Sequence, residues 1–221
     1  MDETSLIRED KPQNYLLVEG KDDEHVLYSL LEHYHIPQRF KIKNKEGILN
    51  LLDTLKTELK GSGPRRIGIV VDADTDLAAR WNALRNRLID FGYTTIPTIP
   101  DGNGTIITEN ELPVVGLWLM PDNRVSGMLE DFIGLLVAPQ DLLWPIAGDT
   151  LQKVIERDCR FSLHHKSKAL IHTWLAWQAE PGKPLGAAIT AATAAHHLDA
   201  TAPQAQQLMT WLRRLFELEA V

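Results

Sequence analysis

Short apolar runs alternate with segments of helical periodicity through the N-terminal part of the sequence. The clearest runs are Asn14–Val18 (NYLLV), Ile67–Val71 (IGIVV) and Val114–Met120 (VVGLWLM). Runs of this length, bounded by turn-forming residues, are typical of strands buried in a sheet. Because strands that alternate with helices form parallel sheets, the sequence predicts an α/β fold with helices on both faces of a mostly parallel sheet.

The segments between these runs carry apolar residues on one face of a helix. In the first segment Val26, Leu30 and Tyr34 recur at helical spacing, after Asp22 or Asp23, either of which can cap the helix. The other elements expected here are helices at Gly47–Leu59, Asp76–Phe91 and Met128–Leu136 and a short strand at Phe40–Lys43.

Two regions differ from this alternation. Thr94–Leu112 is rich in Pro, Gly, Asn and Thr, and is either a loop or a hairpin that turns at Asp101–Gly104. After Pro139 the apolar spacing is helical, with breaks at proline. We therefore predict an α/β domain over residues 1–138 and a small helical subdomain over residues 139–221.

Acidic residues follow the ends of the apolar runs. Glu19 follows the first run, Asp72 and Asp74 the second, and Asp122 the third, while Asp23 lies four residues after Glu19. Ligands of parallel sheets bind beyond the carboxyl ends of the strands, and residues i and i+2 of an extended chain point to the same side. Since Mg²⁺ prefers hard oxygen ligands, these acids predict a Mg²⁺ or Mn²⁺ site.

Most of these acids also have a structural interpretation. Glu19 could be a loop carboxylate that accepts backbone hydrogen bonds. Asp72 and Asp74 could cap the next helix, and Asp76 is the better candidate for that cap. Pro121-Asp122-Asn123 is ordinary turn chemistry, so Asp122 is equally a ligand or a turn residue. The combination of strand-end acids is more specific than any one of them.

The motif Val18-Glu19-Gly20-Lys21-Asp22-Asp23, with Asp72-Ala73-Asp74 after a later strand, resembles the Toprim domain of topoisomerases, primases and OLD-family nucleases. This resemblance covers about residues 15–76. Three downstream segments resemble a small stand-alone Toprim family close to the OLD nucleases; they are residues 116–123, 127–132 and 168–189. A Toprim-like fold is therefore expected.

The resemblance also implies roles for individual residues. Glu19 would be the general acid/base or a metal ligand. Asp72 and Asp74 would be metal ligands, with Asp23 assisting them. In the topoisomerase pattern a third acid follows the D-x-D, and Asp76 fits that spacing.

OLD-type nucleases hold a second metal with later acids and use a downstream lysine. Glu130 or Asp131 would supply such an acid, and since neighbouring helical residues do not face one cavity, we expect only one of them to do so. We take Glu130 as the ligand. Lys166 or Lys168 would supply the lysine, and we take Lys168 as the catalytic residue.

Composition narrows the classes of partner. The net charge of −7 lies in residues 1–138, because residues 139–221 carry equal numbers of acidic and basic side chains. Either nucleic acid is not the ligand, or bound metal cations reverse the local potential.

The single cysteine, Cys159, excludes an intrachain disulfide. With no signal peptide and no run of roughly 18 apolar residues, we expect a cytoplasmic protein without a membrane partner.

The leading functional hypothesis is a Mg²⁺- or Mn²⁺-dependent nuclease that cleaves DNA or RNA phosphodiesters, with phage defence as a contextual interpretation. The alternative is a non-catalytic Toprim-fold module that binds nucleic acid, a partner protein or a second copy of itself. Synthesis, as in primases, ranks last because the chain has no template-binding part.

Overall fold

The structure is a computed structural model and describes residues 14–60, 65–190 and 198–218. Its centre is one five-stranded sheet in the order β2-β1-β3-β5-β4. The strands are β1 (Tyr15–Val18), β2 (Lys41–Asn44), β3 (Arg66–Asp72), β4 (Thr105–Ile107) and β5 (Val114–Met120). All neighbours pair in parallel except β4, which is antiparallel to β5 at one edge. The predicted α/β fold with a mostly parallel sheet is confirmed, and it is consistent with a Toprim-like fold.

The helices of the N-terminal part follow the predicted segments closely. They are α1 (Lys21–His33), α2 (Ile48–Leu59), α3 (Leu77–Phe91) and α4 (Leu129–Gly134). Asp76 caps α3, since its side chain accepts a hydrogen bond from the backbone N–H of Ala79 at 2.9 Å. Helix α1 begins one residue before the two acids expected to cap it, and Asp23 lies in its first turn.

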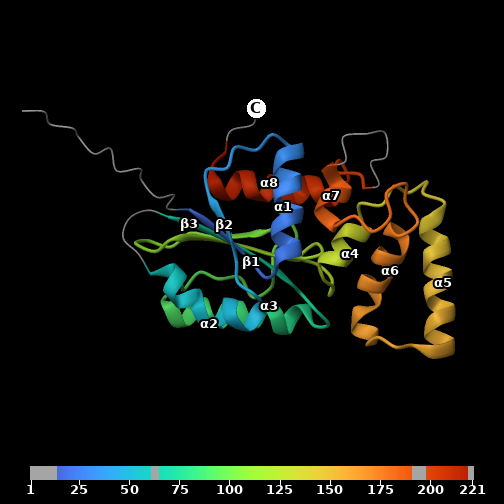
Figure 1. Ribbon diagram of the computed structural model, residues 1–221. Helices are drawn as coiled ribbons and strands as arrows, with labels where there is room; N and C mark the ends of the chain where they lie inside the picture. The colour runs from blue at the N-terminus through green and yellow to red at the C-terminus, as the bar shows by residue number, and fades with distance from the viewer. Residues whose placement is uncertain (1–13, 61–64, 191–197, 219–221) are drawn as a thin grey trace, which may run out of the picture.

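Helices cover both faces of the sheet, as Figure 1 shows: α1 and α8 lie on one side, and α2 and α3 on the other. Alternate strand residues point to opposite faces. On one face Leu16, Val70 and Trp118 join the core formed with α1 and α8. On the other, Leu17 and Ile69 join the core with α2 and α3. Full burial on both faces explains why these strands are uninterrupted apolar runs rather than alternating ones.

The helices after residue 138 are α5 (Leu143–Asp158), η1 (Leu163–His165), α6 (Lys166–Leu175), α7 (Leu185–Thr190) and α8 (Pro203–Phe216). They confirm the predicted helical C-terminal part. Helix α8 nevertheless packs directly on the sheet. Gly68 and Gly116 are register neighbours on β3 and β5, and a Cβ atom at Gly116 would lie 2.5 Å from Leu215 Cδ2. The two glycines therefore leave room for Leu215 to sit against the strands.

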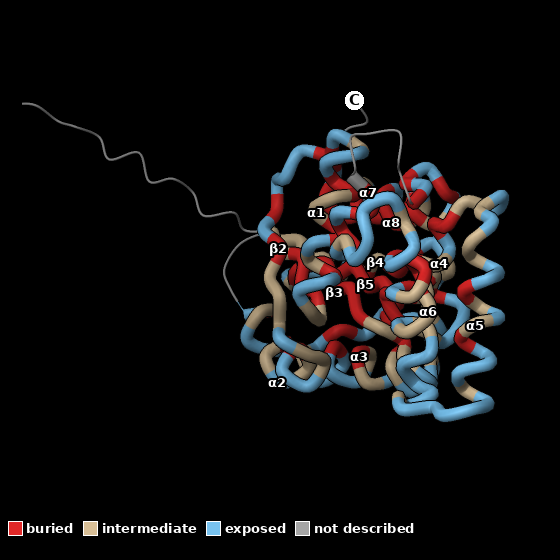
Figure 2. Tube along the Cα trace, turned by 45° about the vertical axis from the view of Figure 1, so that its right-hand side comes forward, coloured by how far each residue is buried: buried red, intermediate tan, exposed pale blue. Residues whose placement is uncertain are grey.

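Helices α5 and α6 form an antiparallel arm beside the sheet (Figure 1). Figure 2 shows buried residues concentrated in the strands and the inner helix faces, while most of α5 is exposed. The inner helix of the arm, α6, packs against α4. This packing brings the segment 163–168 toward the edge where β1 and β3 end.

The segment 94–112 combines both predicted forms. Thr105–Ile107 pairs with β5, so a hairpin exists, but its turn lies after residue 107. The backbone N–H of Gly104 donates to Asp101 O at 2.9 Å, so a turn at Asp101–Gly104 also exists and leads into β4. Among the described residues, no helix is both long enough and apolar enough to cross a membrane.

Candidate functional site

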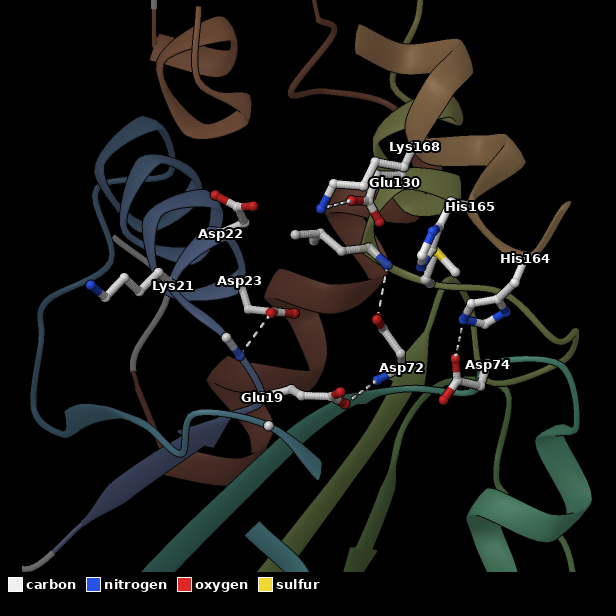
Figure 3. A pocket seen from close by; sticks show the side chains of 14 residues that line it. Glu19, Lys21, Asp22, Asp23, Asp72, Asp74, Glu130, His164, His165 and Lys168 are labelled. Atoms are coloured by element: carbon white, nitrogen blue, oxygen red, sulfur yellow. Dashed lines mark hydrogen bonds and ion pairs between the residues drawn. The ribbon is translucent and has the colours of Figure 1, made fainter. Parts of the chain in front are cut away.

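A cavity of about 490 Å³ opens at the carboxyl ends of β1 and β3 (Figure 3). Five segments of the chain meet there: the turn after β1 with the start of α1, the residue before α2, the end of β3, the start of α4, and η1 with the start of α6. The lining residues are Glu19, Gly20, Lys21, Asp22, Asp23, Gly47, Asp72, Asp74, Met128, Leu129, Glu130, His164, His165 and Lys168.

Glu19 and Asp72 meet because β1 and β3 are parallel neighbours. Val18 is paired with Val70, so both strands end at the same level. The Oε2 atom of Glu19 accepts a hydrogen bond from the backbone N–H of Asp72 at 3.4 Å. Burial raises the pKa of Glu19, although the positive charge of Arg80 opposes this.

The carboxylate of Asp72 is fixed by the start of α4. Its Oδ1 atom accepts a hydrogen bond from the backbone N–H of Leu129 at 2.8 Å. Burial and the charges of Asp23, Glu19 and Glu130 raise the pKa of Asp72 to about 9. The side chain is therefore held in place but is electrostatically unfavourable when ionised.

Asp23 lies in the first turn of α1 and is 6% exposed. Its Oδ2 atom accepts a hydrogen bond from the backbone N–H of Gly20 at 3.0 Å. Its Oδ1 atom is buried and has no hydrogen-bond partner among the described residues. Burial, followed by the charge of Glu19, raises the pKa of Asp23 to about 7.

Glu130, on α4, is 7% exposed and faces the same cavity. The Nζ atom of Lys168, on α6, lies 3.3 Å from Glu130 Oε1. Figure 3 shows this pair above Asp72 and Asp23. Asp131 points elsewhere, since it accepts hydrogen bonds from the backbone N–H of Met128 and from the hydroxyl of Ser167.

Asp74 lines the same cavity and is more exposed than Asp23 and Glu130, with a side chain that is 34% exposed. It has a positive φ of 58°, and its backbone N–H donates to Gly127 O at 2.8 Å. Its carboxylate forms an ion pair with Arg80 of α3. The Nε2 atom of His164 lies 3.1 Å from Asp74 Oδ1. Asp74 thus connects the end of the sheet to the arm.

The structure therefore brings together Glu19, Asp23, Asp72, Asp74, Glu130 and Lys168, all of which were predicted as site residues. It does not bring Asp122 to this cavity. The Oδ1 atom of Asp122 accepts hydrogen bonds from the backbone N–H groups of Arg124 and Val125, which is the turn interpretation of that residue. Asp76 and Lys166 also lie outside the lining.

His164 and His165 line the cavity, although neither was among the predicted site residues. Their participation depends on the packing of α6 against α4, which no local pattern reveals. Lys21 and Asp22 also line the cavity and are exposed; Figure 3 shows the Lys21 side chain extending away from Asp72. Their position after the Val18–Gly20 segment was a signal that could have found them.

The chemistry of the lining suits a divalent cation. Within residues 14–60, 65–190 and 198–218, no three His, Cys, Asp or Glu side chains are already gathered as a metal-binding group. Six carboxylates nevertheless line the cavity, and four of them, those of Glu19, Asp23, Asp72 and Glu130, act electrostatically on one another. One buried oxygen, Asp23 Oδ1, has no hydrogen-bond partner within the described residues. Buried like charges are costly unless a cation compensates them. The four interacting carboxylates offer only hard oxygen ligands, which fits Mg²⁺ or Mn²⁺.

Comparison with known proteins places the chain in a family but gives no activity. Residues 13–217 match the profile of the family described as protein of unknown function, DUF3226. The chain belongs to the DUF3226 family. No curated protein and no solved structure matches it. Any function must therefore be argued from the site itself.

Proposed function

We propose that this DUF3226 protein is a nuclease that depends on a divalent metal and cleaves phosphodiester bonds of DNA or RNA. The observation that carries the proposal is the cluster of Glu19, Asp23, Asp72 and Glu130 in one cavity at the carboxyl edge of a parallel sheet. Parallel sheets bind their ligands at this edge. Maintaining four clustered carboxylates has a clear physical reason if a cation binds between them.

These carboxylates would hold Mg²⁺ or Mn²⁺, and such an ion supplies Lewis-acid activation and compensates negative charge at phosphate oxygens. The chain's own groups do the remaining work. Glu19 sits at the end of β1, where it would accept a proton from the attacking water or serve as a ligand. The Leu129 N–H holds Asp72 in one orientation, so the ligand is preorganised.

The opposite wall of the cavity is basic. His164 and His165 belong to η1, and Lys168 lies in the first turn of α6. A phosphate bound between this wall and the acids would meet the Lys168 cation on one side, and the ion that the acids would hold would offset its charge on the other. Lys168 would then contact a non-bridging oxygen of the scissile phosphate, as the predicted catalytic lysine.

The resemblance to stand-alone Toprim proteins close to the OLD nucleases favours the same reaction class, and phage defence remains the contextual part of the proposal. We also infer a cytoplasmic location. The one cysteine of the sequence, Cys159, is exposed and free, which suits a reducing compartment.

The test is cleavage of labelled single- and double-stranded DNA and RNA with Mg²⁺ or Mn²⁺, with and without a chelator. The variant is Asp72→Asn, and the matched control is Asp76→Asn, which lies outside the cavity and keeps a residue able to cap α3. We expect the wild type and the control to cut, and Asp72→Asn and the chelated protein not to cut. Absence of cleavage by the wild type on all four substrates would favour the binding-module alternative.

A further inference from the structure

A second cavity, of about 600 Å³, lies next to the first and is not used by the proposed reaction. It is enclosed by the start of α3, the loop 98–103 and the turn after β5. Its volume falls within the range of about 300 to 1,000 Å³ that is usual for ligand sites.

The two cavities lie on either side of one short stretch of chain. Asp74 lines the first cavity and Leu77 the second. Three residues of chain span at most roughly 11 Å, so the two cavities are near neighbours. The segment after β5 also joins them, because Arg124 lines the second and Met128 the first.

The wall of the second cavity mixes apolar and amide groups. Leu77 and Ile99 supply apolar surface, and Ile99 is 72% exposed although it is a large aliphatic side chain; Trp81 lies beneath them and is only 1% exposed. Asn82 and Asn103 are exposed on the rim. Exposed apolar surface bordered by amides suits an unpaired nucleobase, since amides can pair with its edge while its face contacts the wall.

Arg124 supplies a positive charge at the mouth of this cavity. Its side chain lies over Gly102, where a Cβ atom would come within 2.6 Å of Arg124 Nε. Within the described residues, the guanidinium group forms one hydrogen bond, at 3.5 Å, to the uncharged side chain of Gln207. The charge of Arg124 is therefore available for a phosphate.

Two buried donors also adjoin the cavity without a partner. Trp81 Nε1 and Asn123 Nδ2 are both buried, and neither has a hydrogen-bond partner within the described residues. Buried donors of this kind are uncommon in folded proteins. Both lie beneath the wall of the cavity, so a bound base would reach them only if the covering side chains shift.

We propose that the second cavity is a subsite for an unpaired nucleotide of a nucleic-acid strand, with the base against Leu77 and Ile99 and its phosphate on Arg124. This deepens the proposed function and rests on it: the strand whose phosphate reaches the acids of the first cavity continues into the second. A paired base has its edge occupied and its face stacked, so the subsite selects single strands or unpaired ends over duplex.

The experiment measures binding of fluorescein-labelled oligonucleotides of ~12 nucleotides by fluorescence anisotropy, in EDTA and at low salt. Single-stranded DNA, single-stranded RNA and the matching duplexes are the probes. The variants are Arg124→Gln and Asn82→Asp, both at exposed positions where folding is preserved and is checked by circular dichroism. Arg157→Gln is the control, because it removes the same charge from an exposed position on α5.

We expect Arg124→Gln and Asn82→Asp to weaken binding of single strands by about 5- to 10-fold, with little change for duplex. Arg157→Gln should change single-strand binding by less than about twofold. If both subsite variants bind single strands as the wild type does, or if Arg157→Gln causes the same loss, the subsite is refuted.

Cleavage assays on the same proteins separate this proposal from the proposed function. Binding that depends on Arg124 in a wild type that never cleaves would refute the nuclease and keep the subsite. A different result would refute the subsite and keep the nuclease. In that case cleavage would be lost in Asp72→Asn, whereas Arg124→Gln would bind and cleave single strands as the wild type does.

Discussion

The Nζ atom of Lys168 lies 3.3 Å from Oε1 of Glu130, which joins the arm formed by α5 and α6 to the acids at the end of the sheet. The contact depends on α6 packing against α4. It places a flexible cation where negative charge is concentrated and where a phosphate would bind. The arm therefore contributes to the site and does not merely flank it.

Replacing this lysine tests its role. We expect Lys168→Ala to lower the rate of cleavage by about 100-fold, the usual cost of removing one charge-stabilising group from an active site. The affinity for Mn²⁺ should stay unchanged or rise, because a cation next to Glu130 is removed. Lys166→Ala, two residues away and outside the cavity, is the control and should cleave normally. A loss of Mn²⁺ binding in Lys168→Ala would show that the lysine acts only by supporting the fold of the site.

The metal-free protein should become less stable as the pH rises. Asp72 has an ordinary pKa of 3.8 and a folded-state pKa of about 9, so between these values the folded state binds the extra proton. Each unit by which the pH rises in this window therefore lowers the free energy of unfolding. Below pH 3.8 the carboxyl group is protonated in both states, and the stability no longer depends on it. At pH 8, Asp72→Asn should raise the free energy of unfolding by at least about 1 kcal/mol. Denaturant titrations at pH 5 and pH 8 measure this, and equal stability of the two proteins at pH 8 would contradict it.

Metal binding should be strongly pH-dependent. A cation must displace protons from Asp23, with a pKa of about 7, and Asp72, with a pKa of about 9. We expect the affinity for Mn²⁺ to increase by about 10-fold or more between pH 6 and pH 8, with proton release that depends on the ionisation enthalpy of the buffer. An affinity that does not change over this range would mean that the buried carboxylates are not ligands.

The packing of α8 on the sheet should depend on the glycines of β3 and β5. Gly116→Val would place atoms within the space of Leu215, and overpacking of this kind costs about 1 to 3 kcal/mol. Gly148→Ala, in α5 where a Cβ atom meets nothing within 4 Å, should be neutral or slightly stabilising. Chemical unfolding of both variants compares the two sites, and a Gly116→Val protein as stable as the wild type would show that α8 is not tightly packed.

The sheet was predictable from the sequence because strands that are buried on both faces appear as uninterrupted apolar runs. Val114–Met120 is apolar throughout, which distinguishes it from an amphipathic helix. The strand β4 was harder to predict, since Thr105–Ile107 is three residues long and follows a turn. The position of α8 on the sheet could not be read from its own periodicity, because an amphipathic helix packs equally well on a sheet or on other helices.

The same contrast applies to the site. Glu19, Asp72 and Asp74 were predictable because parallel strands end at one edge of a sheet. Glu130 was predicted from the resemblance and not from its spacing. His164 reaches Asp74 only through the packing of α6 on α4, which no local pattern encodes. Asp122 follows a strand as the others do, but its carboxylate is occupied by its own turn.

The most direct test of the account is calorimetric titration of the protein with Mn²⁺ and Mg²⁺ at pH 8, comparing the wild type with Asp72→Asn and Asp76→Asn. The account predicts that the wild type and Asp76→Asn bind a divalent cation and that Asp72→Asn, while folded, binds it at least about 10-fold more weakly. If the wild type binds no cation at millimolar concentration, with or without nucleic acid, the clustered carboxylates are not a metal site and the proposed nuclease is contradicted.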